Sequence, residues 1–205
     1  MTQTPKTNYQ LTLDRTLREL TEKQLHPRLL LHACCAPCSS YVLEYLRQYF
    51  DITVFYYNPN ISPEPEYRHR VDEIQRLIRE MCPEVHFIEG RYEPERFYEM
   101  AKGLENEPER GARCLKCYRL RLEESALEAR KGGFDFFTTT LSISPQKDSG
   151  VLNATGKAVS DEYGVPYLFS DFKKRGGYKR SIELSAQFSL YRQNYCGCVF
   201  SRSRT

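Results

Sequence analysis

Apolar residues occur along the chain in two patterns, as short continuous runs and as longer stretches with a helical spacing. Short runs rich in leucine, β-branched and aromatic residues are typical of strands buried on both faces of a parallel sheet. The amphipathic stretches between them are typical of helices that pack on such a sheet. The runs predict strands at residues 29–33, 52–57, 85–88, 134–141 and 167–169, and the stretches predict helices at 37–50, 63–81, 93–102, 114–130, 147–163 and 182–191.

This alternation of strands and helices predicts an α/β fold with a mostly parallel sheet and helices on both faces. The first 27 residues differ from the rest, because they are polar and carry leucines at a helical spacing up to Pro27, which ends a helix. Those leucines are Leu11, Leu17, Leu20 and Leu25. We therefore expect an N-terminal helical extension at residues 1–27, followed by a single α/β catalytic domain at residues 28–205.

The composition narrows the class of protein. The chain has 205 residues, of which 40% are hydrophobic, and a mean hydropathy of −0.63, which excludes a membrane protein and a disordered chain. No apolar segment typical of a secretory signal stands near the start, so we expect a cytoplasmic location. The chain also has eight cysteines. In a reducing compartment, clustered thiols more often bind metals or perform redox chemistry than form structural disulfides.

Three of these cysteines stand together. Cys34, Cys35 and Cys38 follow the first predicted strand at its turn into a helix, the edge of the sheet where α/β folds bind ligands. The turn lets Cys34 and Cys35 converge, although neighbouring side chains of a strand point to opposite faces. The start of the helix supplies free backbone N–H groups and a positive dipole end, which favour thiolates and anionic clusters. Packing of small side chains is the alternative, and the clustering of the thiols disfavours it.

A second pair, Cys114 and Cys117, opens a predicted helix, so both sulfurs lie on one helix face and can reach one metal or cluster. A thioredoxin-like pair is disfavoured because a polar segment, and no apolar strand, precedes Cys114. Together with Cys34 and Cys35, the pair makes four thiolates, the number that a [4Fe-4S] cluster or a single structural zinc ion needs. The spacing alone leaves both possibilities open.

Other cysteines remain after four ligands are counted. Cys196 and Cys198 flank Gly197 near the end of the chain. With Cys38, they are available to hold a second metal, to form a redox pair, or to stand idle. This surplus disfavours a single closed zinc site. Cys82, next to Pro83 at an expected helix end, is interpreted as unrelated to the other cysteines.

Positive charge gathers around the cysteine pairs. The net charge is only +3, but residues 110–121 hold five basic residues and no acid, and residues 173–205 hold eight basic residues and one acid. Solvated helix faces are the alternative reading of each run. The coincidence with thiols favours an anionic cofactor, a phosphate-bearing partner, or both.

The loops at the same edge of the sheet carry further information. The turn after the first strand has no glycine, whereas a phosphate-cradling loop would need several, so ATP-dependent chemistry is disfavoured. The turns at residues 57–61 and 142–148 are polar and lie at this edge too. They read as ordinary turns, but their position together with the cysteines suggests a pocket.

Five segments carry a family resemblance: HACCAPC at residues 32–38, YNPNI at 57–61, CLKCYR at 114–119, TLSISPQK at 140–147 and YCGC at 195–198. Together they resemble the cobalamin-independent epoxyqueuosine reductase family, called QueH, and the resemblance covers about residues 28–200. It implies a HUP/PP-loop-like nucleotide-binding-type fold. It also implies the reductive removal, by two electrons, of the epoxide oxygen of epoxyqueuosine in tRNA to give queuosine.

The resemblance further implies a [4Fe-4S] cluster held by Cys34, Cys35, Cys114 and Cys117, with an additional iron beside it. Some members have an acidic residue where this chain has Cys38, so the candidate ligands of the second metal are Cys38, Cys196 and Cys198, the last two also as a redox pair. We expect the second iron to bind the epoxide oxygen while the cluster relays electrons from an unidentified donor. The expected catalytic residues are Cys38, with Tyr57 and Asp148 as candidate proton donors.

A tRNA substrate implies contacts with phosphates and stacking of splayed bases on aromatic rings, and no membrane partner. The expected contacts come from the two basic runs: Arg113, Lys116, Arg119, Lys173, Lys174, Arg175, Lys179 and Arg180. Two other functions are weighed. One is a zinc-stabilised RNA-binding module without catalysis, and the other is an iron–sulfur tRNA thiolation enzyme, which would need ATP and is disfavoured by the missing glycine-rich loop.

Overall fold

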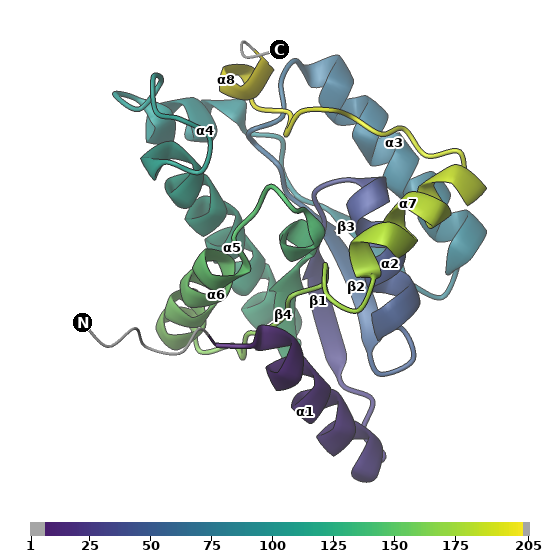
Figure 1. Cartoon of the computed structure of the whole chain (residues 1–205). Helices are drawn as coiled ribbons and strands as arrows, with labels where there is room; N and C mark the ends of the chain where they lie inside the picture. Colours follow the sequence, from purple (N-terminus) through teal and green to yellow (C-terminus); the bar gives the residue numbers. More distant parts are fainter. Residues whose placement is uncertain (1–6, 203–205) are drawn as a thin grey trace.

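The computed structural model describes residues 7–202 and centres on a parallel sheet of four strands in the order β3-β2-β1-β4 (Figure 1). The strands are β1 (Arg28–His32), β2 (Asp51–Tyr56), β3 (His86–Glu89) and β4 (Phe136–Thr139). β1 pairs with both β2 and β4, so it lies inside the sheet. The carboxyl ends of all four strands therefore meet at one edge.

Helices cover both faces of this sheet (Figure 1). α2 (Ala36–Leu46), α3 (Glu64–Met81) and α7 (Gly177–Gln187) lie on one side, and α5 (Ala112–Gly132) and α6 (Ser149–Tyr163) lie on the other, with α4 (Pro94–Ala101) against α5. A short 3-10 helix, η1 (Thr140–Ile143), follows β4, and α8 (Val199–Arg202) lies near the end of the chain. The predicted α/β fold with a mostly parallel sheet is confirmed.

The strands alternate between two hydrophobic cores because successive side chains of a strand point to opposite faces. In β1, Leu29 and Leu31 join the core under α2 and α3, while Leu30 joins the core under α5 and α6. In β4, Phe137 joins the second core. Both faces are thus buried, which is why these strands are continuous apolar runs in the sequence.

The N-terminal region forms α1 (Tyr9–Glu22), whose start is capped by the side chain of Asn8 accepting from the backbone N–H of Leu11. Leu17 and Leu20 are buried in the core shared with β1 and α2, whereas Leu11 and Leu25 are exposed. Two of the four leucines expected on the apolar face of this helix therefore pack against the core. Residues 1–6 of the expected extension, and Arg204 of the second basic run, lie outside the described residues.

Two boundaries differ from expectation at the end of the sheet. The expected strand at 134–141 is shorter, because the Thr139 hydroxyl accepts from Leu141 N at 3.2 Å and starts η1. The expected fifth strand at 167–169 is wrong: Tyr167 forms only an isolated bridge with Phe137. The pairing does not continue because β4 ends at Thr139, where η1 begins, and the Thr138 hydroxyl donates to the carbonyl oxygen of Leu168 at 2.8 Å.

The last long helix also differs from the expected 182–191. It begins earlier, at Gly177, and ends at Gln187. A Cβ at Gly177 would lie 2.0 Å from the carbonyl oxygen of Phe172 and 2.4 Å from the ring of Tyr41, so the helix starts where only glycine fits against α2. Its polar first turn concealed this start in the sequence. Within residues 7–202, no helix combines the length and apolarity that crossing a bilayer requires.

Candidate functional site

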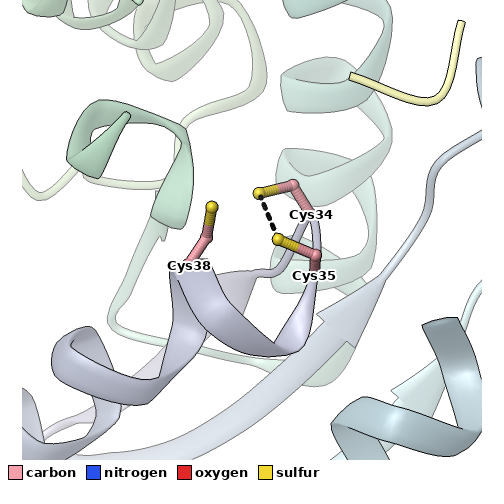
Figure 2. A group of neighbouring side chains, drawn as sticks. All are labelled: Cys34, Cys35 and Cys38. Atoms are coloured by element: carbon pink, nitrogen blue, oxygen red, sulfur yellow. Dashed lines mark hydrogen bonds between the residues drawn. The ribbon is translucent and has the colours of Figure 1, made fainter. Parts of the chain in front are cut away.

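Three cysteines converge where β1 turns into α2 (Figure 2). Cys35 is the extended N-cap residue of α2, and Pro37 stands in the first turn, where its missing N–H costs no helical hydrogen bond. The Sγ atoms of Cys34, Cys35 and Cys38 lie within 4.8 Å of one another. The Sγ atoms of Cys34 and Cys35 are 3.8 Å apart. The predicted convergence of Cys34 and Cys35 at the turn is therefore present.

The three thiols share protons unequally. Hydrogen bonds from the thiols of Cys35 and Cys38 hold the pKa of Cys34 well below its usual range. The same hydrogen bonding to Cys34 raises the pKa of Cys35 to about 12 and raises that of Cys38 as well. Thr140 of η1 donates to Cys34 Sγ at 3.4 Å. Cys34 is therefore the thiolate of the group, with hydrogen-bond donors around it.

A cavity of about 460 Å³ opens in front of these cysteines. The start of α2, part of α7 and residues 192–196 line it. The loop after η1 also lines it, through Ser144, Gln146 and Lys147. The predicted pocket between the edge loops is therefore present in part: the 142–148 loop lines it, and the 57–61 loop does not.

A second, much smaller cavity of about 20 Å³ adjoins the first. Cys114 and Cys117 reach it from α5, and Cys196 and Cys198 reach it from the C-terminal segment. Cys196 lines both cavities. Seven of the eight cysteines thus surround two adjoining cavities, and all eight are free thiols.

Cys82 is the exception. It is 0% exposed at the end of α3, inside the hydrophobic core, and burial raises its pKa to about 12. Its interpretation as a bystander agrees with this position.

The expected cluster ligands come from two helices. Cys34 and Cys35 lie at the start of α2, Cys114 and Cys117 at the start of α5, and Cys34 and Cys114 pack against the same small group of apolar side chains. Among the described residues, Cys114 and Cys117 do not join the close group in which the sulfurs lie within 4.8 Å. Cys34 and Cys35 line the large cavity, and Cys114 and Cys117 line the small cavity that adjoins it.

Arg121 lies between the two cavities and lines both. Its side chain is buried, and its Nη2 donates to Asn58 Oδ1 at 2.6 Å. Burial would lower the pKa of Arg121, but the neighbouring charges of Cys117, Cys34 and Cys196 outweigh it and raise that pKa. The guanidinium is therefore charged and surrounded by thiol groups.

Lys147 is a second cation at the junction of the cavities, since it also lines both. Its Nζ lies 5.8 Å from the ring centroid of Tyr118. Burial opposes its charge, but Cys196 and Tyr118 raise its pKa. Lys147 therefore carries a proton at the cavity.

The segment that brings Cys196 to the site is fastened to α3 and crosses it (Figure 1). Tyr191 N donates to Glu73 Oε2 at 2.9 Å, and Arg70 Nη1 donates to the carbonyl oxygen of Cys196 at 3.5 Å. Gly197 has φ +99°, a conformation that side chains rarely adopt. These contacts position Cys196 and Cys198 without any regular secondary structure.

The two expected proton donors are not at the cavities. Tyr57 is buried, and its ring stacks on Phe55 with centroids 6.1 Å apart. Both rings belong to the hydrophobic core under α5 and α6. Asp148 is the N-cap of α6, where its Oδ1 accepts from Gly150 N at 2.7 Å. Neither residue lines either cavity, so the structure does not support their expected catalytic placement.

The expected tRNA contacts divide into three groups. Arg113 is 2% exposed and donates to backbone carbonyls of residues 104, 105 and 107 at 2.9 Å each, so it braces a loop and is unavailable to a phosphate. Four of the expected residues form ion pairs with carboxylates of the chain: Arg119, Lys173, Arg175 and Arg180. The other three expected residues are exposed and form no ion pair within residues 7–202: Lys116, Lys174 and Lys179.

Comparison with known proteins shows which family has a sequence similar to that of this chain. A family model described as "Epoxyqueuosine reductase QueH" matches residues 29–204, which is most of the chain. The chain belongs to the QueH family of epoxyqueuosine reductases. Proteins named Epoxyqueuosine reductase QueH from Staphylococcus epidermidis and Streptococcus pyogenes are 43% and 42% identical to it, over 96% of this chain and 85% and 78% of their own lengths. One from Thermotoga maritima is 38% identical over 84% of this chain and 89% of its own length.

The QueH resemblance and the oxidoreductase class expected from the sequence are therefore confirmed. The site of this QueH chain also contains residues that the sequence did not single out as functional, above all Arg121, Asn58 and His32. A signal for Arg121 was present: it stands seven residues after Cys114 and four after Cys117, on the same face of the helix. Asn58 and His32 stand in two of the segments that carry the family resemblance, but their contacts at the site join separate strands and could not be read from the sequence.

Proposed function

We propose that this chain removes the epoxide oxygen of epoxyqueuosine in tRNA as water, leaving a carbon–carbon double bond and consuming two electrons and two protons. The observation that carries the proposal is the gathering of seven free cysteines around two adjoining cavities that share a buried arginine. A non-catalytic RNA-binding module would not need a cavity of about 460 Å³ beside its cysteines.

The donor set fits a [4Fe-4S] cluster held by Cys34, Cys35, Cys114 and Cys117. Each cluster thiolate binds a different iron, so the four sulfurs need to surround a common space and need not touch. Tyr56 adds a second observation: its hydroxyl is buried, has no hydrogen-bond partner among the described residues, and interacts with the charge of Cys35. Burial raises the pKa of Tyr56, so its hydroxyl stays protonated and can donate a hydrogen bond. A bound cluster or its thiolate ligands would supply the acceptor.

The second metal is proposed to lie among Cys38, Cys196 and Cys198. Cys38 and Cys196 line the large cavity, and Cys198 lines the adjoining one. When bound, the cluster supplies single electrons from an electron donor yet to be identified, and the second iron supplies a Lewis acid for the epoxide oxygen.

The chain's own residues then bind the modified base and supply a proton. The large cavity has the size of pockets that enclose small organic ligands, and an anticodon loop presents unpaired bases that enter such pockets readily. Lys147 takes the place of Tyr57 and Asp148 in the proposal, because it is a protonated residue that lines both cavities. Lys116, Lys174 and Lys179 are proposed to contact phosphates.

The cluster-bearing unit in this proposal is residues 28–205, with residues 1–27 as an extension that packs α1 on the core. Within the described residues, no part of α1 lines either cavity, which supports this division. The free thiols suit a reducing compartment, so we propose a cytoplasmic location.

An anaerobic assay tests the function. The protein is reconstituted with iron and sulfide, supplied with a chemical reductant and tRNA bearing epoxyqueuosine, and the digested nucleosides are examined by mass spectrometry without ATP. We expect a product 16 mass units lighter, the mass of one oxygen atom. A colourless protein with one tightly bound zinc and no product would favour the RNA-binding module. A product that requires ATP and contains sulfur would favour the thiolation enzyme.

A further inference from the structure

Arg121 is a buried cation at the junction of the two cavities. Its side chain is 3% exposed, and no ion pair formed by residues 7–202 includes it. The other buried arginine that lines the large cavity, Arg70, differs in this respect, because its Nη2 lies 2.7 Å from Glu66 Oε1. A buried cation without a counter-charge is costly, so Arg121 requires an anion from the site itself.

Neutral groups hold Arg121 in place. Its Nη2 donates to Asn58 Oδ1 at 2.6 Å, and the Asn58 amide donates to the carbonyl oxygen of Ala33 at 2.9 Å. Asn58 therefore ties the guanidinium to the backbone just before Cys34. Because Asn58 is uncharged, it fixes the geometry of Arg121 without cancelling its charge.

His32 flanks the same guanidinium from β1. Its Nε2 lies 3.0 Å from the carbonyl oxygen of Tyr57 and its Nδ1 lies 2.8 Å from Thr139 Oγ1. We assign the proton to Nε2, which donates to the carbonyl, while Nδ1 accepts from the Thr139 hydroxyl. Arg121 Nε approaches Nε2 only at 3.4 Å. The ring is buried and neutral in this arrangement, so it too leaves the charge of Arg121 uncompensated.

The groups within reach that can become anions are the cysteines, because a thiol loses its proton when it binds a metal. Arg121 lines both cavities, and its charge interacts with Cys117, Cys34 and Cys196, which come from three separate segments. His32 and Thr139 are the last residues of β1 and β4, and Asn58 lies in the loop after β2. Three strand ends thus help to place one positive charge among cysteines from the start of α2, from α5 and from the C-terminal segment.

We propose that Arg121 is a positioning residue for the metal centre: its uncompensated charge, held by Asn58, stabilises the thiolate ligands and raises the reduction potential of the centre. This inference rests on the proposed function, because it presumes a redox centre at Cys34 and Cys117. A nearby cation favours the reduced, more negative state of such a centre, and buried donors around the sulfurs act in the same direction.

Three variants separate charge from shape. Arg121→Gln removes the positive charge, and Arg121→Lys keeps it. Asn58→Asp keeps the guanidinium but places a carboxylate beside it, which balances its charge. Arg130→Gln is the matched control, because Arg130 is exposed in the last turn of the same helix. Each protein is reconstituted, its folding is checked by circular dichroism, and its midpoint potential is measured by a dye-mediated redox titration followed in visible absorbance. Iron retention against a chelator is measured separately.

We expect Arg121→Gln and Asn58→Asp to shift the midpoint potential to more negative values and to weaken iron retention by about tenfold or more. Arg121→Lys should stay closer to the wild type than Arg121→Gln, and Arg130→Gln should match the wild type. If Arg121→Gln does not fold, Asn58→Asp decides alone. Unchanged potentials in folded variants of a protein that does hold the centre would overturn the role of Arg121 and leave the proposed function standing. A wild-type protein that binds no iron would overturn both.

Discussion

Asn58 Oδ1 accepts a hydrogen bond from Arg121 Nη2 at 2.6 Å, and this contact joins the loop after β2 to the middle of α5. The two residues stand 63 positions apart in the chain. The contact places a charged group between cysteines from different helices, and it connects the fold of the sheet edge to the chemistry of the site.

Removing one expected cluster ligand should abolish the cluster, while removing the cysteine in the core should not. We expect Cys117→Ala to lose the broad visible absorbance of the reconstituted protein and its iron. Cys82→Ala is the matched control, because Cys82 is equally a buried thiol but lies in the hydrophobic core. It should keep the absorbance and lose only about 1 kcal/mol of stability. Full absorbance in Cys117→Ala would contradict the ligand assignment.

The buried His32 should make the metal-free protein sensitive to acid. Burial, aided by Arg121, lowers the pKa of His32 from 6.5 to about 3. Between these values the unfolded chain binds a proton that the folded chain does not, so stability is complete above about pH 6.5 and falls as the pH drops toward 3. The loss reaches at most about 5 kcal/mol.

Chemical denaturation of the metal-free protein between pH 7 and pH 4 checks this expectation, because the unfolding free energy should fall as the pH is lowered. His32→Gln should start less stable and show a shallower slope over the same pH range. Equal slopes for the two proteins would show that another group causes the acid sensitivity.

The three unpaired lysines should contribute more to tRNA binding than their ion-paired neighbours. Lys179 is exposed without an ion pair among the described residues, whereas Arg180, next to it on α7, pairs with Glu44 and Glu183. We expect Lys179→Gln to weaken tRNA binding and to reduce the slope of log affinity against log salt by about one. Arg180→Gln should change the slope less. The measurement is a salt series of binding isotherms, and equal slopes for the two variants would count against this surface.

Gly197 should be needed to place the last two cysteines. A Cβ at this position would lie 2.9 Å from Ile61 Cγ1 and 3.1 Å from Arg70 Nη1, on a backbone with φ +99°. We expect Gly197→Ala to cost about 1–3 kcal/mol and to reduce the content of the second metal. Gly103→Ala is the control, because Gly103 also has positive φ (+77°) but nothing lies within 4 Å of its Cβ position.

Metal content per chain and the unfolding free energy, measured on both glycine variants, separate backbone strain from the clash. If the two variants lose the same stability and keep the same metal content, the packing of Gly197 against Ile61 and Arg70 is unimportant.

The sequence by itself determined the α/β class, the positions of most strands and helices, and the cysteine segments that mark the family. These features are local: a run buried on two faces is apolar throughout, and a helix on a sheet repeats its apolar residues every turn. The same local signals predicted a strand at 167–169, where the structure has only one bridge, because β4 ends at Thr139 and η1 follows. They also placed Tyr57 and Asp148 near the chemistry, since sequence position at a strand end does not tell which way a side chain points.

Only the tertiary structure decided which charges serve the site. Arg113 and Arg121 stand in the same basic run, yet one braces a loop through three carbonyls and the other lies between the cysteines. Whether Arg121 is neutralised depends on what packs against it, and Asn58, His32 and the cysteines come from segments far apart in the chain. The effect of a buried charge depends on the groups that surround it, and folding brings those groups together from segments that no local sequence pattern connects.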